Sequence, residues 1–263
     1  MGHQVSFSRG QRWALAALVL LLAGFLPAIV FNHQIFLFLN GLNTPVTDKV
    51  WLSFTTLGDG LILAIVLGCF LLVNPRVACA GLLLMLASSV VIHLIKALYV
   101  LPRPVELFPA VHVVGPLLRS GAFPSGHTAS SVSAALAIAY FGSSRWFGTA
   151  ALVVAALISV SRVFVSAHFP TDVVGAAIIA LVVFILLTAL IGPKIGDRIP
   201  SAPTLSAPLW RWALFVEVLA AVFALTVYSI RFAEYPPVAA AVSVAVLGFL
   251  ATRYRKAACR DLP

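Results

Sequence analysis

Residues 161–172 read Ser-Arg-Val-Phe-Val-Ser-Ala-His-Phe-Pro-Thr-Asp and lie between two apolar runs, each long enough to cross a bilayer. The ionisable side chains in this stretch are Arg162, His168 and Asp172. Such groups are costly next to membrane-spanning segments, so their presence indicates a functional site. The stretch also predicts a helix boundary, because Pro170 suits the first turn of a helix and not its interior.

This boundary predicts how the polar side chains lie. His168 is expected on the loop before the second helix, and Asp172 in the first turn of that helix, where the helix dipole favours a carboxylate. Asp172 can then pair with one imidazole nitrogen and leave the other free to attack or to take a proton. Arg162 adds a planar guanidinium that suits a phosphate group.

The composition is that of a polytopic membrane protein. The 263 residues are 62% hydrophobic and only 10% charged, whereas a soluble domain carries about 25% charged residues. The net charge of +9 would suggest nucleic acid in a soluble protein, but here the basic residues fall mostly in short loops, so no nucleic-acid partner is expected. Cys69, Cys79 and Cys259 form no paired framework and no zinc-spaced cluster, and are expected to be small hydrophobic residues.

Apolar runs of about 20 residues span roughly 30 Å as helices. Residues 32–57 are more mixed and predict short helices in the membrane interface, with Trp51 as an anchor. The predicted fold is an all-α polytopic transmembrane helix bundle, with a six-span core over residues 1–192 and a linker, two further spans and a basic tail over residues 193–263. The eight expected spans are 13–31, 57–73, 77–100, 125–141, 146–164, 171–191, 209–230 and 238–251.

The distribution of basic residues predicts the orientation. With the N-terminus inside, eleven of the 17 lysine and arginine residues fall on the inner side and six on the outer side, which is the expected bias. Both termini are then cytoplasmic, and the basic tail faces anionic lipid. Three polar groups reach the outer face together, namely Lys96 with Arg103, the run 124–127, and Arg162 with His168 and Asp172.

These groups predict an anion site with acid and base capacity. Lys96, Arg103 and Arg162 are expected to neutralise the charge of a bound phosphate. Ser125 and Gly126 open a helix, so their backbone N–H groups can point at phosphate oxygens, and Gly126 allows close approach.

Two histidines have distinct expected roles. His168, oriented by Asp172, is the candidate nucleophile. His127 is the candidate acid that protonates the leaving oxygen. His93 is expected to be a packed histidine, Asp59 is expected to start a helix, and Glu217, within the seventh span, has no assigned role.

The spacing of these residues resembles the three-part signature of the type 2 phosphatidic acid phosphatase family, whose relatives include vanadium haloperoxidases and glucose-6-phosphatase-like enzymes. The three parts are Lys96 through Arg103-Pro104, then residues 124–127, then residues 161–172, and the resemblance covers roughly residues 40–190. It implies a helical bundle, a phosphohistidine on His168, Asp172 as its orienting carboxylate, His127 as general acid, and no metal or other cofactor. It further implies phosphate contacts from Lys96, Arg103, Ser125, Gly126 and Arg162.

The resulting prediction is an integral-membrane lipid phosphatase of the bacterial inner membrane, with its site on the periplasmic face. The candidate substrates are undecaprenyl pyrophosphate, phosphatidylglycerophosphate, phosphatidic acid and lipid A 1-phosphate. Two alternatives stay open: a lipid phosphotransferase with the same site, and an anion or lipid transporter that uses the basic cluster. The oligomeric state is not predicted.

Overall fold

The computed structural model describes residues 9–119, 121–200, 208–230 and 237–258, and these residues form helices without strands. The expected all-α bundle is thus confirmed. Parts of the predicted linker, the turn at 231–236 and the tail with Cys259 lie outside the described residues. The helices are α1 (Arg9–Val30), α2 (Asn32–Asn40), α3 (Pro45–Leu57), α4 (Gly60–Cys69), η1 (Phe70–Leu72), α5 (Pro75–Leu98), α6 (Pro104–Leu107), α7 (Gly126–Phe141), α8 (Arg145–Phe164), α9 (Pro170–Arg198), α10 (Pro208–Ile230) and α11 (Val238–Ala258).

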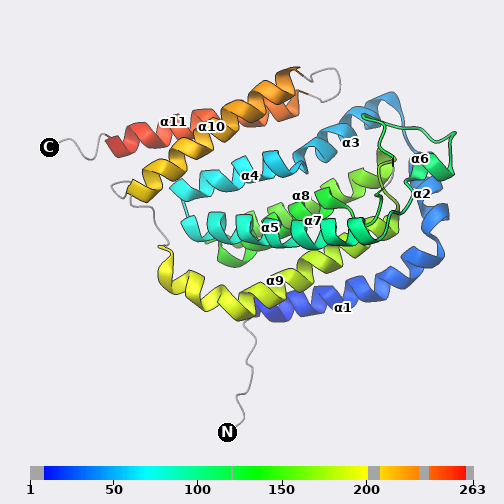
Figure 1. The fold of residues 1–263 in the computed structure, drawn as a ribbon, viewed down its shortest axis with the longest axis horizontal. Coiled ribbons are helices and arrows are strands. Elements are labelled where there is room, and N and C mark those ends of the chain that lie inside the picture. Colours follow the sequence, from blue (N-terminus) through cyan, green and yellow to red (C-terminus); the bar gives the residue numbers. More distant parts are fainter. Residues whose placement is uncertain (1–8, 120, 201–207, 231–236, 259–263) are drawn as a thin grey trace, which may run out of the picture.

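Helix α7 is the centre of the bundle and packs against α4, α5, α8 and α9 (Figure 1). Its sequence is rich in alanine and serine, and small residues allow helix backbones to approach closely in a membrane. A Cβ at Gly148 of α8 would lie 2.8 Å from the Cα of Ala139, so this crossing requires a glycine. The hydroxyls of Ser88 on α5 and Ser133 on α7, 3.0 Å apart, join a second crossing.

The chain is a multi-pass membrane protein. Among the described residues, fewer helices than the eight expected are long and apolar enough to cross a membrane. Four of them, α1, α5, α8 and the first part of α9, are long and apolar enough to cross a membrane, and a bent pair makes a fifth. Helix α7 has only 16 residues. The apolar segments Leu214–Tyr228 of α10 and Val238–Arg253 of α11 are also shorter than 18 residues. The eight expected spans therefore all correspond to helices, but not all reach the length of a full span.

The second expected span differs most from the structure. The pair formed by α3 and the α4–η1 segment is together long and apolar enough for one span, but it is bent by 61° at Gly58 and Asp59. Asp59 starts α4 as predicted, because its carboxylate accepts a hydrogen bond from the Leu61 N–H at 2.8 Å. Helix α3 packs against α8, and Trp51 stacks on Phe164 with ring centroids 4.2 Å apart. Residues 45–57 thus extend a bent span and pack on the bundle.

Helices α10 and α11 pack against each other and against α4, on one side of the bundle, whereas α1 covers α9 on the other side (Figure 1). The buried Glu217 of α10 lies against Gly68 of α4, where a Cβ would come within 1.9 Å of its carboxylate. A glycine is therefore required at 68 to seat this acid. Helix α9 continues to Arg198, beyond the boundary predicted at 192.

Candidate active site

The loop between α8 and α9 folds back over the end of α8. The carbonyl oxygen of Arg162 accepts hydrogen bonds from the N–H groups of both Ala167 and His168, each at 3.1 Å. Ser166 takes the left-handed backbone conformation, with φ 61°. Residues other than glycine rarely adopt this conformation, and here it belongs to the tight turn before His168. His168 lies on this loop and Asp172 lies in the first turn of α9, so the local structure predicted from Pro170 is confirmed.

His168 and Asp172 form the buried centre of the site. Their side chains are 97% and 95% enclosed, and Nδ1 of His168 lies 3.4 Å from Oδ2 of Asp172. The same carboxylate oxygen accepts a hydrogen bond from the Phe169 N–H at 2.8 Å, which holds it at the start of α9. The carboxylate therefore faces Nδ1, and this leaves Nε2 as the nitrogen that can react.

Burial and the nearby positive charges both favour the neutral form of the His168 imidazole. Burial lowers the pKa of His168 well below the usual 6.5, and the positive charges of Arg162, Arg103 and Lys96 lower it further. A neutral imidazole has the lone pair that nucleophilic attack needs. Lys96 and Arg103 belong to one motif and Arg162 to another, so the fold brings two distant segments of the chain close to His168.

Arg103 connects the first motif to the site loop. Its side chain is buried, and Nη1 donates a hydrogen bond to the Ala167 carbonyl oxygen at 2.7 Å. Its backbone N–H donates to the Glu106 carboxylate, also at 2.7 Å. Burial lowers the pKa of Arg103, while the carboxylates of Asp172 and Glu106 counteract the effect. This arginine thus supports the loop that carries His168 as well as adding charge.

Arg162 is buried in the last turn of α8, where its Nη1 donates a hydrogen bond to the hydroxyl of Thr55 on α3. Sequence reasoning missed Thr55, which lies outside the three motifs. The feature of the sequence that could have indicated Thr55 is the pair Thr55-Thr56, two adjacent polar residues among apolar ones. Both side chains are buried in the structure. Helix α3 therefore orients a cation of the site.

The start of α7 corrects the expectation for the Ser125 N–H, whereas the expected approach of a phosphate to Gly126 stays a prediction. The N–H of Ser125 donates to the backbone oxygen of Asp172 at 3.0 Å, so it is not free for a phosphate oxygen in this structure. A Cβ added at Gly126 would meet no atom within 4 Å, so packing within the protein does not require a glycine there. The Ser125–Asp172 contact instead ties the first turns of α7 and α9 together, and so places His127 at the same end of the bundle as His168.

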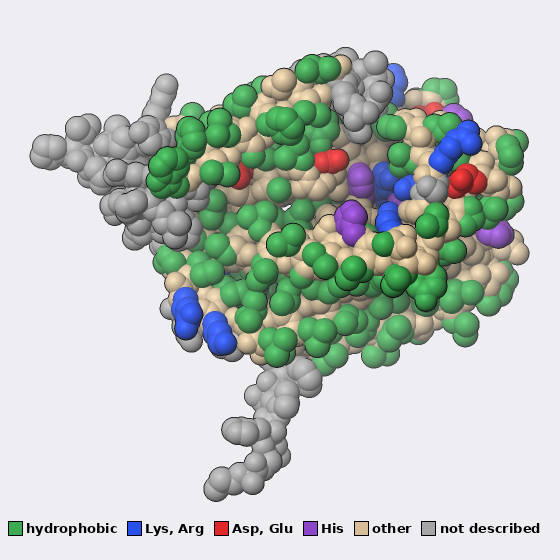
Figure 2. All heavy atoms as spheres, in the orientation of Figure 1, with side chains coloured by type: hydrophobic (Ala, Val, Ile, Leu, Met, Phe, Trp, Pro, Cys, Tyr) green, Lys and Arg blue, Asp and Glu red, His purple; other side chains and the backbone are tan. Residues whose placement is uncertain are grey.

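His127 and Lys96 complete the expected set. Both are half-buried, Lys96 in the last turn of α5 and His127 in the first turn of α7. The α3–α4 bend lies against His127, because a Cβ at Gly58 would be 3.3 Å from the Cβ of His127 and 2.4 Å from Cγ2 of Ile158. Figure 2 shows lysine, arginine and histidine side chains gathered in a hollow on this face.

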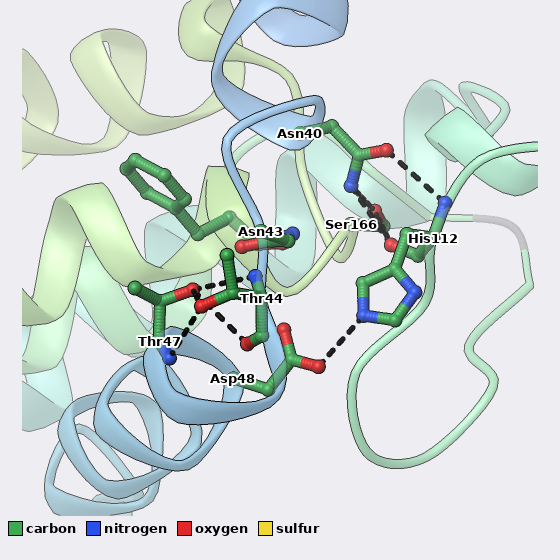
Figure 3. A network of polar contacts seen from close by, with 8 residues as sticks. Asn40, Asn43, Thr44, Thr47, Asp48, His112 and Ser166 are labelled. Atoms are coloured by element: carbon green, nitrogen blue, oxygen red, sulfur yellow. Dashed lines mark hydrogen bonds and ion pairs between the residues drawn. The ribbon is translucent and has the colours of Figure 1, made fainter.

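A second polar network supports the site loop from outside (Figure 3). The Asn40 amide donates to the Ser166 hydroxyl and to the His112 carbonyl oxygen, both at 2.8 Å, and accepts from the His112 N–H at 3.1 Å. The His112 ring lies 2.8 Å from the Asp48 carboxylate. Asn40 therefore joins α2, the long loop 99–125 and the strained turn before His168.

Over the described residues, no group of three or more histidine, cysteine or acidic side chains is arranged to hold a metal ion. The expectation that the reaction needs no metal stays a prediction.

Comparison with known proteins agrees with the motifs. Residues 78–195 match the model of the PAP2 superfamily. The chain is 29% identical over 158 residues to the undecaprenyl-diphosphatase BcrC of Bacillus subtilis (strain 168), covering 58% of this chain and 80% of that protein. The crystal structure of Aquifex aeolicus LpxE is similar with a TM-score of 0.56 and 26% identity, covering 59% of this chain and 93% of that one. The family resemblance expected from the three motifs is thus confirmed, since residues 78–195 match the PAP2 superfamily model.

Proposed function

We propose that this protein is an integral-membrane lipid phosphatase that works through a phosphohistidine. The observation that carries the proposal is the buried His168, which lies 3.4 Å from Asp172 and close to the charges of Lys96, Arg103 and Arg162. The similarity to an undecaprenyl-diphosphatase supports phosphate chemistry on a lipid.

The first step transfers the phosphoryl group to the enzyme. The lone pair on Nε2 of His168 attacks phosphorus, the bond from phosphorus to the leaving oxygen breaks, and that oxygen takes a proton from His127. Asp172 stabilises the positive charge that forms on the imidazole. The arginines and Lys96 stabilise the charge on the phosphoryl oxygens, which is the main task in such a transfer.

The second step is hydrolysis. Water attacks phosphorus and gives a proton to His127, which is now a base. The bond between phosphorus and Nε2 breaks, the electron pair returns to His168, and inorganic phosphate leaves. The substrate classes that fit are the lipid phosphates and pyrophosphates named above, and a site at the outer interface would let their acyl or prenyl chains stay in the bilayer.

The orientation belongs to this proposal. The excess of basic residues on the inner side supports cytoplasmic termini and a periplasmic site in a bacterial inner membrane. Reaction of cysteines introduced beside the site with a membrane-impermeant reagent in intact cells would test it.

Phosphate release by the purified protein from a panel of lipid phosphates and pyrophosphates tests the chemistry. The His168→Ala variant should lose at least about a thousandfold in rate, because the nucleophile is gone, while its helical circular dichroism stays that of the wild type. Unchanged turnover in this variant would reject the mechanism. Labelled phosphate that ends on a second lipid and not in water would favour a phosphotransferase.

A further inference from the structure

A pocket of about 200 Å³ adjoins the site on the side of His127. Its wall includes Gly126 and His127 of α7, Gly58 and Gly60 at the α3–α4 bend, and Ser89 and His93 of α5. The hollow with histidine and basic side chains in Figure 2 is on this face. None of the steps proposed above uses His93 or Ser89, although both lie in the wall that contains the proposed acid.

His93 is turned toward this pocket and not packed in the core. The sequence favoured a packed histidine, but the side chain is exposed and lines the cavity. Its Nδ1 lies 2.7 Å from the carbonyl oxygen of Ser89. A carbonyl oxygen only accepts, so Nδ1 carries the proton and the hydrogen bond orients the ring. The second ring nitrogen, Nε2, is thereby left for a ligand.

The position of His93 relative to Lys96 fits a ligand with two anionic groups. Residues three apart lie on the same side of a helix, about 4.5 Å apart along its axis. In the proposed function Lys96 contacts the phosphate that is transferred to His168. His93 lies about one turn before Lys96 on α5 and lines the same pocket as His127.

We propose that His93 binds the leaving group of the substrate, and that this group is the second phosphate of a lipid pyrophosphate. The inference rests on the proposed function, in which His127 protonates the leaving oxygen. The atoms bonded to that oxygen then occupy the pocket next to His127. In a lipid pyrophosphate they are a phosphorus with anionic oxygens. These oxygens match the Ser89 and Ser130 hydroxyls in the wall and a His93 ring that carries a proton on Nε2 as well as on Nδ1 when the ligand is bound. In a phosphate monoester the first atom is a carbon, which gains nothing from an imidazole.

The test compares two lipids on the purified full-length protein, farnesyl pyrophosphate and phosphatidic acid, with phosphate release as the readout. His93→Ala should lower kcat/KM for farnesyl pyrophosphate about tenfold, the effect of one charge-assisted hydrogen bond. The value for phosphatidic acid should change less than about twofold, which also shows that the variant folds. His93→Gln keeps a donor and should lose less. The neighbouring, exposed Leu94 supplies the control Leu94→Ala, with no expected effect on either lipid.

Inhibition gives a second readout on whichever lipid is turned over. His93→Ala should weaken inhibition by inorganic pyrophosphate about tenfold and leave inhibition by orthophosphate within about twofold. Equal losses on both lipids and both inhibitors, or no loss at all, would overturn the role of His93 while the phosphatase activity stands. A wild-type protein that releases phosphate from neither lipid would overturn the proposed function and this inference with it.

Discussion

Replacement of Thr55 by valine should impair the enzyme without touching any of the three motifs. Valine has nearly the shape of threonine but has no hydroxyl, so the change removes the oxygen that accepts a hydrogen bond from Nη1 of Arg162. Thr55 and Arg162 are only 6% and 5% exposed, so water has little access to replace that oxygen. Thr55 is a positioning residue for a cation of the site.

The size of the effect follows from the burial of the guanidinium. A buried donor that loses its acceptor costs about 1–3 kcal/mol, and more when the donor is charged. If Arg162 turns to find another acceptor, it stabilises the transferred phosphoryl group less well. A loss of about 1.4 kcal/mol in transition-state stabilisation corresponds to tenfold in kcat/KM. We therefore expect a decrease in kcat/KM of about tenfold, with most of the change in kcat.

The assay is phosphate release by purified Thr55→Val, with two matched variants beside it. Thr55→Ser keeps the hydroxyl and should recover most of the activity. Thr56→Val removes the neighbouring buried hydroxyl, which donates to the Leu52 carbonyl oxygen of its own helix at 2.7 Å and does not reach the site. Its activity should stay within about twofold of the wild type. The reasoning is refuted if Thr55→Val is as active as the wild type, or if Thr56→Val is equally impaired.

Three further results are expected. Gly58→Ala should destabilise the protein by about 1–3 kcal/mol, because its Cβ would lie 2.4 Å from Cγ2 of Ile158; thermal unfolding should show a smaller penalty in an Ile158→Ala background, and an equal penalty would exclude this clash as the cause. Asn40→Ala removes three hydrogen bonds to the loops beside the site, at about 1 kcal/mol each, and should lower kcat more than it raises KM; kinetics that match the wild type would show that the network does not position Ser166. The pKa of His168 is lowered in the folded protein, so the unfolded chain binds more protons and stability should fall as the pH drops below about 6.5; His168→Gln should show a shallower fall between pH 7 and 5, and an identical slope would contradict the assignment.

Much of the candidate site was predictable from the sequence because its ionisable residues lie in short motifs. Pro170 and Asp172 dictate local structure through backbone geometry and the helix dipole, which do not depend on distant residues, so the loop position of His168 was predicted correctly. The arrangement of supporting residues was not predictable in this way. Ser125 was expected to offer its N–H to a phosphate, but the carbonyl oxygen of Asp172 takes it, and this partner is 47 residues away along the chain.

By itself the amino-acid sequence determined the helical architecture and indicated the candidate reacting groups, because the length of an apolar run and the spacing of a motif can be read from neighbouring residues. Only the tertiary structure decided that α3 bends into the bundle to place Thr55 against Arg162, that Asn40 holds the turn at Ser166, and that His93 faces a pocket. These pairings depend on which helices pack together and at what rotation. That choice is made by close packing of side chains far apart in sequence, which no local pattern records.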